Sequence, residues 1–397
     1  MRGAGFRPRF VISMVIAAMT DAPRTLLFVV TEDWYFWSHR LALARAARDA
    51  GSRVTVAARV QAHRPLIEAE GFRLVSLPWR RRGGSRWDEL RTIWQLYRLM
   101  RRERPELVHL IALKSIVYGG LAARLAGLRA RVSTVAGLGY VFTSKSVQAR
   151  LLRPALRLAL RIAMAGQGSL VTVQNPDDGR VLSRGIVRPE RLVLIRGSGV
   201  DTEKFAPAPE PGGVPVVAMV CRLVRDKGAG TLVAAARQLK AEGVALRVRL
   251  AGALDPENRD AHTRDEIEGW VAAGLVEWSG PIDDVPSLWH TSHIAAYPSA
   301  YGEGIPKTLL EAASCGKPIV TTDMPGCRET VDDGESGFLV PPGDAAALAD
   351  RLKRLVEDPA LRRRMGTAAR AKALAEFADR RIVAETLAAY RRALTGP

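Results

Sequence analysis

The stretch "HIAAYPSAYGEGIPKTLLEAASCGKPIVTT" (residues 293–322) has the pattern of a strand, a helix and a second strand. Pro306 suits the first helical position, where its missing N–H costs nothing, and Gly316 suits the position just after a helix end. A helix is therefore predicted from about Pro306 to Cys315, between strands at "HIAAYPS" and "PIVTT". Two buried strands joined by a helix are typical of a parallel α/β sheet.

The same alternation extends outward from this stretch. Apolar runs that predict strands, with helical segments between several of them, lie at 26–30, 53–59, 107–113, 131–137, 169–175 and 191–199. The Pro- and Gly-rich "APAPEPGGVP" (206–215) interrupts the pattern, which then restarts. We expect an α/β protein with two doubly wound, Rossmann-like domains facing a central cleft. Its expected parts are a tail (1–24), an N-terminal domain (25–205), a linker (206–214), a C-terminal domain (215–379) and a helix that crosses back to the first domain (380–397).

The net charge of +18 lies entirely in the first half of the chain. Residues 1–206 carry 35 Lys+Arg and 15 Asp+Glu, the remainder carries 24 and 26, and no acidic residue occurs from Leu107 to Pro176. This imbalance indicates an anionic partner, which could be a membrane surface, a phosphorylated ligand or nucleic acid. The alternative is a genome that favours arginine codons.

One basic segment, "VQARLLRPALRLALRIAMA" (147–165), is amphipathic. Its four arginines share one helical face among Leu and Ile: Arg150, Arg153, Arg157 and Arg161. Such a segment can lie on an anionic membrane leaflet, or it can be an ordinary surface helix packed on its own domain.

The cysteines and the apolar runs indicate in which compartment the protein works and whether it binds a metal. Cys221, Cys315 and Cys327 have no CxxC spacing, which predicts neither a disulfide framework nor a zinc site and fits a reducing, cytosolic compartment. "FVISMVIAAM" (10–19) imitates a signal peptide, but we interpret it as part of a tail. No run reaches the length of a membrane span, and the chain has no D-x-D triplet or metal-spaced cluster, so we predict no metal.

The sharpest candidate site surrounds the helix of the opening stretch. Its N-terminus is a natural seat for an anion, and Gly302 and Gly304 allow a ligand to approach the backbone. Glu303 in the loop and Glu311 in the helix could then bind hydroxyls of the same ligand. The alternative is that both glutamates only cap and solvate a surface helix.

A second candidate is "CRLVRDKGAGTL" (221–232). Arg222 follows a buried strand, and Lys227 precedes a glycine and a helix. Two cations in this position can hold a diphosphate and stabilise it as a leaving group. In isolation, they could equally be solvated loop cations.

Together these motifs resemble the retaining glycosyltransferases of family 4, which have the GT-B fold. Glu303 to Glu311 matches their E-x7-E pattern and Arg222 to Lys227 their R-x4-K pattern. "GSGVD" (197–201), "GPIDDVPSLW" (280–289) and residues 311–344 also follow the family consensus. The resemblance covers about residues 25–394, and the first half resembles the branch that acts on polyprenyl-diphosphate-linked sugars, such as diacetylbacillosamine-diphospho-undecaprenol.

The resemblance implies roles for individual residues. Arg222 and Lys227 would neutralise the donor diphosphate, Glu311 would bind the ribose, and Glu303 would act in catalysis by contacting hydroxyls of the transferred sugar. The amide of Gly304 and the backbone of Ile282 would also bind the donor, at its phosphate and nucleobase.

On the acceptor side, the resemblance implicates His109 and Lys114, predicted to follow a strand at the cleft. His109 is either catalytic or a buried strand histidine, because the second histidine that many family members carry is replaced by Ile111.

The loop predicted after the first strand, "TEDWYFWSHR" (31–40), would face the acceptor. We expect Ser38 to cap the following helix and Glu32 or Asp33 to bind acceptor hydroxyls. The aromatic side chains could stack on a sugar or rest near a membrane. Alternatively, Trp34 and Phe36 simply pack inward.

The expected function is metal-independent, retaining transfer of a hexose or N-acetylhexosamine from a UDP-sugar to a polyprenyl-diphosphate-linked saccharide. The partners would be the nucleotide sugar, as substrate rather than cofactor, the lipid-linked acceptor and an anionic membrane surface, with the enzyme peripheral at the cytoplasmic face. Alternatives are a soluble acceptor, a basic nucleic-acid-binding protein, and an NAD-dependent oxidoreductase. No nucleic-acid-binding module is recognisable, and no G-x-G-x-x-G follows the first strand.

Overall fold

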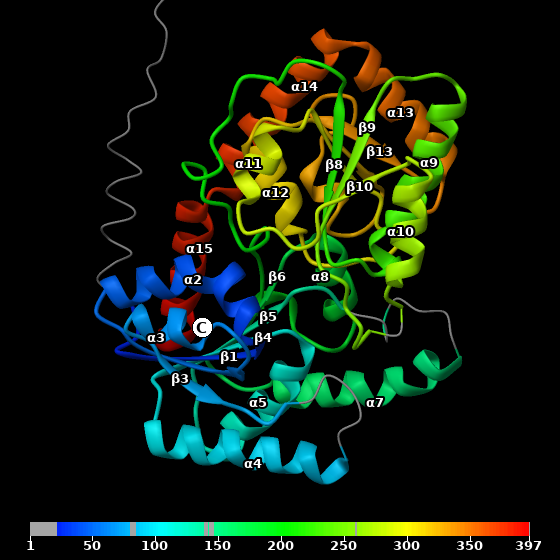
Figure 1. Cartoon of the computed structure of the whole chain (residues 1–397). Coiled ribbons are helices and arrows are strands. Elements are labelled where there is room, and N and C mark those ends of the chain that lie inside the picture. Colours follow the sequence, from blue (N-terminus) through cyan, green and yellow to red (C-terminus); the bar gives the residue numbers. More distant parts are fainter. Residues whose placement is uncertain (1–21, 80–84, 139–141, 143–146, 259, 397) are drawn as a thin grey trace, which may run out of the picture. The chain divides into compact units, whose positions relative to one another are not determined.

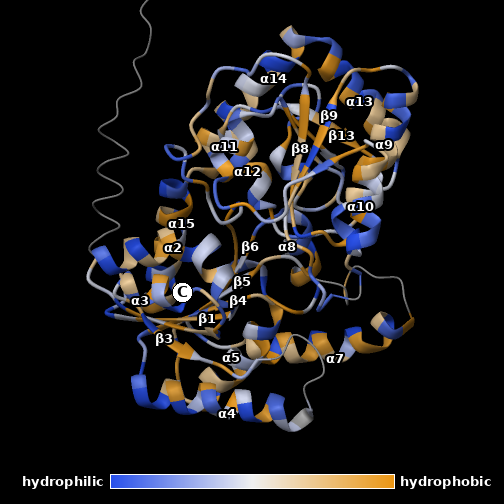
Figure 2. Cartoon of the chain, viewed as in Figure 1, coloured by the Kyte–Doolittle hydropathy of each residue, from blue (hydrophilic) through white to orange (hydrophobic). Residues whose placement is uncertain are grey.

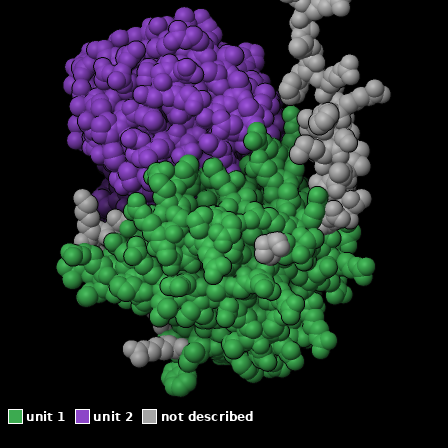
Figure 3. Space-filling model, turned by 180° about the vertical axis from the view of Figure 1, so that it is seen from behind, with its two compact units in different colours: residues 1–195, 380–397 green, residues 196–379 purple. Residues whose placement is uncertain are grey.

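The computed structural model describes residues 22–79, 85–138, 142, 147–258 and 260–396. Its Cα atoms cluster into two compact units (Figure 3). Unit 1 extends to Ile195 and resumes at Arg380, and unit 2 comprises Arg196–Asp379. The predicted linker at 206–214 thus lies inside unit 2 and is not where the units divide, whereas the tail predicted at 1–24 falls almost wholly outside the described residues.

Unit 1, as far as it is described, contains a parallel sheet of seven strands in the order β3-β2-β1-β4-β5-β6-β7 (Figure 1). The strands are β1 (Thr25–Glu32), β2 (Arg53–Arg59), β3 (Arg73–Ser76), β4 (Leu107–Ile111), β5 (Arg131–Val135), β6 (Ser169–Val173) and β7 (Leu192–Leu194). The helices are α2 (Asp33–Asp49), α3 (Arg64–Ala69), α4 (Arg86–Glu103), α5 (Leu113–Leu125), α7 (Val147–Ala163), α8 (Pro176–Ser183) and α15 (Asp379–Thr395). The direction of strand addition reverses between β1 and β4, which is the position where doubly wound sheets bind ligands.

Strand β1 shows how the sheet of unit 1 is buried on both faces. Because successive side chains alternate, Phe28 and its even-numbered neighbours join a core beneath α2, α3 and α15. Leu27 and Val29 point the other way, into a core covered by α4, α5 and α7. Burial on both faces explains the continuous apolar runs of the strands, coloured orange in Figure 2. The sheet is therefore covered by a helical layer on each face.

Unit 2, over its described residues, contains a parallel six-stranded sheet in the order β10-β9-β8-β11-β12-β13. The strands are β8 (Val216–Val220), β9 (Arg247–Ala251), β10 (Glu277–Trp278), β11 (Ile294–Tyr297), β12 (Ile319–Thr322) and β13 (Gly337–Val340). The helices are α9 (Ala229–Ala241), α10 (Arg264–Ala272), α11 (Val285–His290), α12 (Lys307–Ser314), α13 (Ala345–Glu357) and α14 (Pro359–Lys372). The order reverses between β8 and β11, so the two candidate motifs follow the two strands of the switch point.

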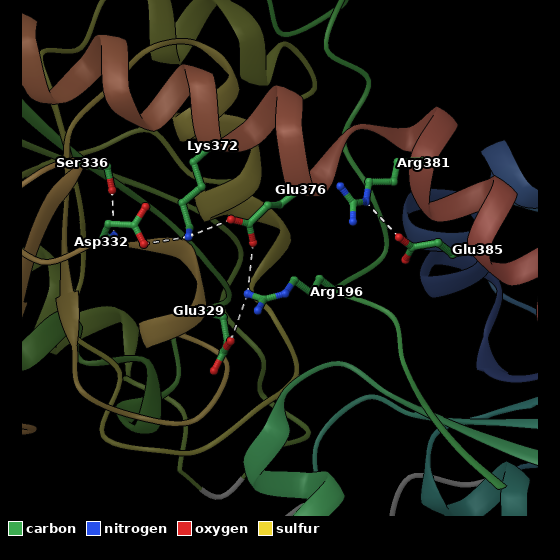
Figure 4. A network of polar contacts seen from close by, with 8 residues as sticks. All are labelled: Arg196, Glu329, Asp332, Ser336, Lys372, Glu376, Arg381 and Glu385. Atoms are coloured by element: carbon green, nitrogen blue, oxygen red, sulfur yellow. Dashed lines mark hydrogen bonds and ion pairs between the residues drawn. The ribbon is translucent and has the colours of Figure 1, made fainter. Parts of the chain in front are cut away.

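The place where the chain enters unit 2 is fixed to the place where it leaves. Arg196 pairs with Glu329 at 3.3 Å and with Glu376 at 3.1 Å, and Lys372 bridges Glu376 and Asp332 (Figure 4). A parallel bridge between Val200 and Ala378 adds backbone hydrogen bonds. This network holds the "GSG" segment (197–199) against α12, where a side chain on Gly197 would meet Leu310.

Candidate functional site

The loop after β8 carries both cations of the R-x4-K motif. Arg222 lies two residues beyond the strand, and Lys227 ends a 3₁₀ turn formed by Arg225–Lys227. The next residue, Gly228, has φ 85°, and a Cβ atom there would lie 2.0 Å from the carbonyl oxygen of Pro298. Only glycine therefore fits this turn, which brings the loop against the segment that follows β11.

That close approach places Lys227 beside Glu303. The Lys227 Nζ lies 2.5 Å from Glu303 Oε2. The other carboxylate oxygen of Glu303 accepts hydrogen bonds from the hydroxyl of Tyr297 at 3.1 Å and from Ser299 Oγ at 3.4 Å. Glu303 is thus held by β11 and the loop that follows it, and both members of the ion pair remain partly exposed.

Arg222 has a separate acidic neighbour. Its Nη1 donates to Asp255 Oδ2 at 2.6 Å, and Asp255 is buried in the loop after β9 while 44% of the Arg222 side chain is exposed. Arg222, Lys227 and Glu303 all act electrostatically on Cys221, although burial is the main reason that the pKa of this thiol rises to about 12. Lys227 and Glu303 therefore meet at the switch point of the sheet, and Arg222 lies in the same loop as Lys227 with Asp255 as its partner.

Glu311 lies within α12 and has a different set of charged neighbours. Burial raises the pKa of its carboxyl to about 7, Lys307 and Lys204 oppose the rise, and Asp379 adds to it. The helix runs from Lys307 to Ser314, so Pro306 is its N-cap rather than its first residue. Gly316, with φ 70°, follows the C-cap as predicted.

The two remaining predicted donor residues lie in other loops of unit 2. Gly304 is in the loop between β11 and α12, and Ile282 is in the loop between β10 and α11. A Cβ atom on Gly326 would lie only 2.2 Å from the carbonyl oxygen of Gly304. The backbone N–H of Glu303 donates to the carbonyl oxygen of Pro325 at 3.1 Å. Ile282 is half-buried between β10 and α11 and packs on the core of unit 2. Their donor-binding roles stay predictions.

The corresponding edge of unit 1 differs from the predicted loop. Strand β1 ends at Glu32 and α2 begins at Asp33, so the aromatic residues lie on a helix. The prediction that Ser38 caps this helix is wrong, because Ser38 lies inside it and its Oγ donates to the Trp34 carbonyl. Of the two residues that the alternative interpretation has packing inward, Phe36 is buried against Phe28, whereas Trp34 is partly exposed.

The two carboxylates at this junction bind protein groups. Asp33 is fully buried and accepts from the backbone N–H groups of Gln61 at 2.6 Å and His63 at 3.0 Å. Glu32 is buried, and its Oε1 lies 3.7 Å from Nη1 of Arg59. Asp33 therefore ties the segment after β2 to the start of α2, which is a structural role.

His109 lies in the middle of β4, inside the strand predicted at 107–113 and not after it, as the alternative of a buried strand histidine stated. The ring is fully buried, with Nδ1 2.6 Å from the hydroxyl oxygen of Tyr390 and Nε2 2.6 Å from Thr134 Oγ1. Burial, with a smaller contribution from Arg40, holds the pKa of His109 well below its ordinary value of 6.5. This is the environment of a buried strand histidine, here joining α15 to the sheet.

Lys114 lies in the first turn of α5. Its Nζ is 3.9 Å from Glu89 Oε1 and lies over the ring of Tyr118. Ala112, the N-cap residue just before α5, has φ 71°, which is strained for a residue with a Cβ. This turn lies at the switch point of unit 1, and the acceptor role of Lys114 stays a prediction.

Sequence reasoning missed three residues that hold the site together: Asp255, Tyr297 and Ser299. Asp255 and Tyr297 belong to β9 and β11 or the loops after them, and these strands flank β8 in the sheet. The carboxyl ends of adjacent parallel strands meet at one edge, so each neighbour supplies an oxygen-bearing group to the central loop. The sequence does show a polar residue at or after the end of each of these strands. Such a residue can be assigned to the site only when the order of the strands in the sheet is known.

Family models match two long segments of the chain, one in each unit. "Glycosyl transferase 4-like" matches residues 25–167, and "Glycosyl transferases group 1" matches residues 200–372. The chain belongs to glycosyltransferase family 4. The R-x4-K and E-x7-E residues of this glycosyltransferase all lie within the second match.

Individual proteins that are similar to this chain are glycosyltransferases as well. The putative colanic acid biosynthesis glycosyltransferase WcaL of Salmonella typhimurium is 38% identical over 183 residues, but the match spans only 44% of each chain. An N,N'-diacetylbacillosaminyl-diphospho-undecaprenol alpha-1,3-N-acetylgalactosaminyltransferase of Campylobacter jejuni is 23% identical over 81% of this chain and 87% of its own. Anabaena HepE, solved with UDP and glucose, superposes with a TM-score of 0.74 at 22% identity over 92% and 99% of the two chains. This last likeness shows the GT-B fold.

The described residues offer neither a metal-binding cluster nor a helix that could span a membrane. No group of three or more His, Cys, Asp or Glu side chains arranged to hold a metal ion occurs among them. None of the helices described combines the length and the apolar character that crossing a bilayer requires.

Proposed function

We propose that this glycosyltransferase moves a hexose or N-acetylhexosamine from a UDP-sugar to a polyprenyl-diphosphate-linked saccharide, with retention of configuration, in the synthesis of a cell-surface glycan. The observation that supports the proposal is the ion pair of Lys227 and Glu303 at the switch point of unit 2, with Arg222 in the same loop as Lys227. HepE, which shares the fold, binds UDP, and the Campylobacter relative is named for an undecaprenyl-diphosphate-linked acceptor.

The charges suit a leaving diphosphate. Lys227 has three N–H donors, so a hydrogen bond to Glu303 leaves others for a phosphate oxygen. Arg222 offers a planar guanidinium that is half exposed and anchored by Asp255. Both cations can therefore stabilise negative charge as it develops on the diphosphate, and no metal ion is required for this step.

We propose a same-face reaction. The bond between the sugar C1 and the diphosphate oxygen breaks, and its electron pair stays on that oxygen. The acceptor hydroxyl oxygen bonds to C1 from the same side, and its proton passes to the departing phosphate oxygen. Glu303 positions the sugar through its hydroxyls, while its partners Tyr297 and Ser299 fix its orientation.

The acceptor assignment includes contact of the enzyme with the inner face of the plasma membrane. Helix α7 exposes Leu151 and Leu158 next to Arg150 and Arg157, and it contains no acidic residue. Each cation near an anionic leaflet contributes about 1 kcal/mol. Replacing Arg150, Arg153, Arg157 and Arg161 with Glu should abolish pelleting with anionic vesicles, and unchanged pelleting would refute this part of the proposal.

The reaction is tested by incubating the enzyme, with EDTA present, with a panel of nucleotide sugars and short polyprenyl-diphosphate-linked saccharides. Mass spectrometry should show one added hexose or N-acetylhexosamine with a UDP-sugar, and NMR should show the donor's anomeric configuration in the product. Transfer only to lipid-free saccharides would favour a soluble acceptor. An absence of transfer with every donor, or a requirement for a metal, would contradict the proposal.

A further inference from the structure

Helix α4 presents an apolar stripe away from the core of unit 1. Trp87, Leu90 and Trp94, spaced three and four residues apart, share one face of the helix and are 78%, 56% and 54% exposed. Two large indoles on the surface, one turn on either side of a leucine, are unusual for a helix whose other face packs in a core. The stripe is therefore suited to contact something outside the chain.

The charges of α4 are sorted between its two sides. Its three acids are engaged by protein groups: Asp88 accepts from the backbone N–H of Ser85, Glu89 from the hydroxyl of Tyr118, and Glu103 from Arg73. The exposed side instead carries the arginines Arg91, Arg98, Arg101 and Arg102. The surface around the stripe is consequently cationic.

Arg98 connects the cationic and apolar parts of this surface. Its guanidinium lies 4.7 Å from the centre of the Trp94 ring. Beside it, an open groove of about 780 Å³ runs between α4 and the edge strand β3, lined by Val75, Leu77, Trp94, Arg98, Arg101 and Arg102. Apolar walls with arginines alongside suit an amphiphile that has an anionic head.

We infer that the exposed face of α4 is a docking surface for an anionic phospholipid bilayer. Trp87, Leu90 and Trp94 would enter the boundary between headgroups and acyl chains, where indoles are favoured, and the arginines would meet lipid phosphates. The same helical layer contains α7, because α4 packs on α5 and α5 packs on α7. Orange and blue segments alternate along both helices (Figure 2). The inference rests on the proposed function insofar as it extends the membrane contact proposed for α7.

The test is co-sedimentation of the full chain with vesicles of phosphatidylcholine and phosphatidylglycerol, without substrates. The triple variant W87S/L90S/W94S should lower the partition coefficient on the order of tenfold. R98E/R101E should lower it as well, by about fivefold or more for each arginine, and the loss should shrink at high salt. The matched control is L66S on α3, a leucine that is 46% exposed on the opposite helical layer of unit 1, and it should bind vesicles like the wild type.

Two measurements keep the result interpretable. Urea unfolding should be unchanged in the triple variant, since the replaced side chains are exposed, and brominated lipids should quench tryptophan fluorescence in the wild type more strongly than in the variant. Unchanged vesicle binding by both α4 variants would overturn the inference. It would also be overturned if light scattering showed that the wild type self-associates and the triple variant does not, because the stripe would then join two copies of the chain.

The transferase assay separates this inference from the proposed function. If both hold, the triple variant should turn over a short, water-soluble acceptor normally and a vesicle-borne acceptor more slowly. Loss of vesicle binding in a protein that transfers no sugar would support the surface and reject the function. Equal turnover of the vesicle-borne acceptor with normal binding would support the function and reject the surface.

Discussion

The switch points of the two sheets contain similar side chains in very different surroundings. In unit 2, Lys227 and Glu303 form a partly exposed ion pair, and Arg222 in the same loop is partly exposed next to Asp255. In unit 1, Asp33 and His109 are fully buried, and their polar atoms bind groups of the protein itself. A polar residue on or just after a strand of the switch point is therefore available for chemistry only where its neighbours leave part of it accessible to a ligand.

The largest effect expected is on the unit 2 edge. Lys227→Ala should lower kcat/KM by about 10²–10³-fold, because it removes a cation from the developing diphosphate. Steady-state kinetics, with the UDP-sugar that the nucleotide-sugar panel selects, would measure this loss. The matched control is Arg225→Ala in the same 3₁₀ turn, whose partner is Glu266 and which should remain close to wild type. Comparable activity of the two variants would remove Lys227 from the site.

On the unit 1 edge, the expected effect is on stability. Asp33→Ala should lower the free energy of unfolding by about 2–4 kcal/mol, since it leaves the backbone N–H groups of Trp34, Gln61 and His63 without their buried acceptor. Urea denaturation would measure the loss, and Asp49→Ala, at the exposed end of the same helix, should cost less than about 0.5 kcal/mol. A stable Asp33→Ala variant that no longer uses acceptor would show instead that this edge binds substrate.

Glu311 shares a property with each of the two residues above. Like Lys227 it is predicted to bind the ligand, and like Asp33 it is a carboxylate affected by burial, which is unfavourable for Glu311 in the ligand-free protein. The pKa of Glu311 is raised to about 7 from 4.5. Its contribution to the stability of the fold is therefore fully present below pH 4.5 and is lost as the pH rises through 7. Glu311→Gln should therefore stabilise the protein at pH 8 by roughly 2 kcal/mol while weakening UDP binding. Thermal denaturation and calorimetry would measure both.

The control for Glu311 is Glu242→Gln. The pKa of Glu242 is lowered by hydrogen bonds from Gln238 and Lys353, so the same substitution there should not stabilise the protein. Normal UDP affinity in Glu311→Gln would exclude the predicted contact with the ribose.

The smallest effect concerns His109. Because its pKa is lowered in the folded protein, its contribution to stability is present above pH 6.5 and is lost as the pH falls below that value. The wild type should lose about 1 kcal/mol more than His109→Gln on going from pH 7 to pH 5.5. Denaturant titrations at both pH values would detect this difference, and parallel pH profiles would show that the ring is not held neutral.

Much of the fold was predictable from local pattern. The alternation of apolar strands and helices determines a doubly wound architecture, although the short edge strand β3 was missed because its four residues carry too little periodicity. The residues of the R-x4-K and E-x7-E motifs stood out in their local sequence, and the resemblance to a known family then joined the two motifs into one expected site. By contrast, the boundary between β1 and α2 was misplaced, because aromatic residues after a strand predict a loop and a buried helix turn equally well.

By itself, the sequence determined the fold class, the family and the positions of Arg222, Lys227, Glu303 and Glu311, because these depend on residues close together in the chain. Only the tertiary structure decided which groups meet. Asp255 reaches Arg222 because β9 lies beside β8, and His109 loses access to solvent because α15 returns from the far end of the chain to cover it. Partners and burial depend on strand order and helix packing, which bring together residues that no local spacing connects.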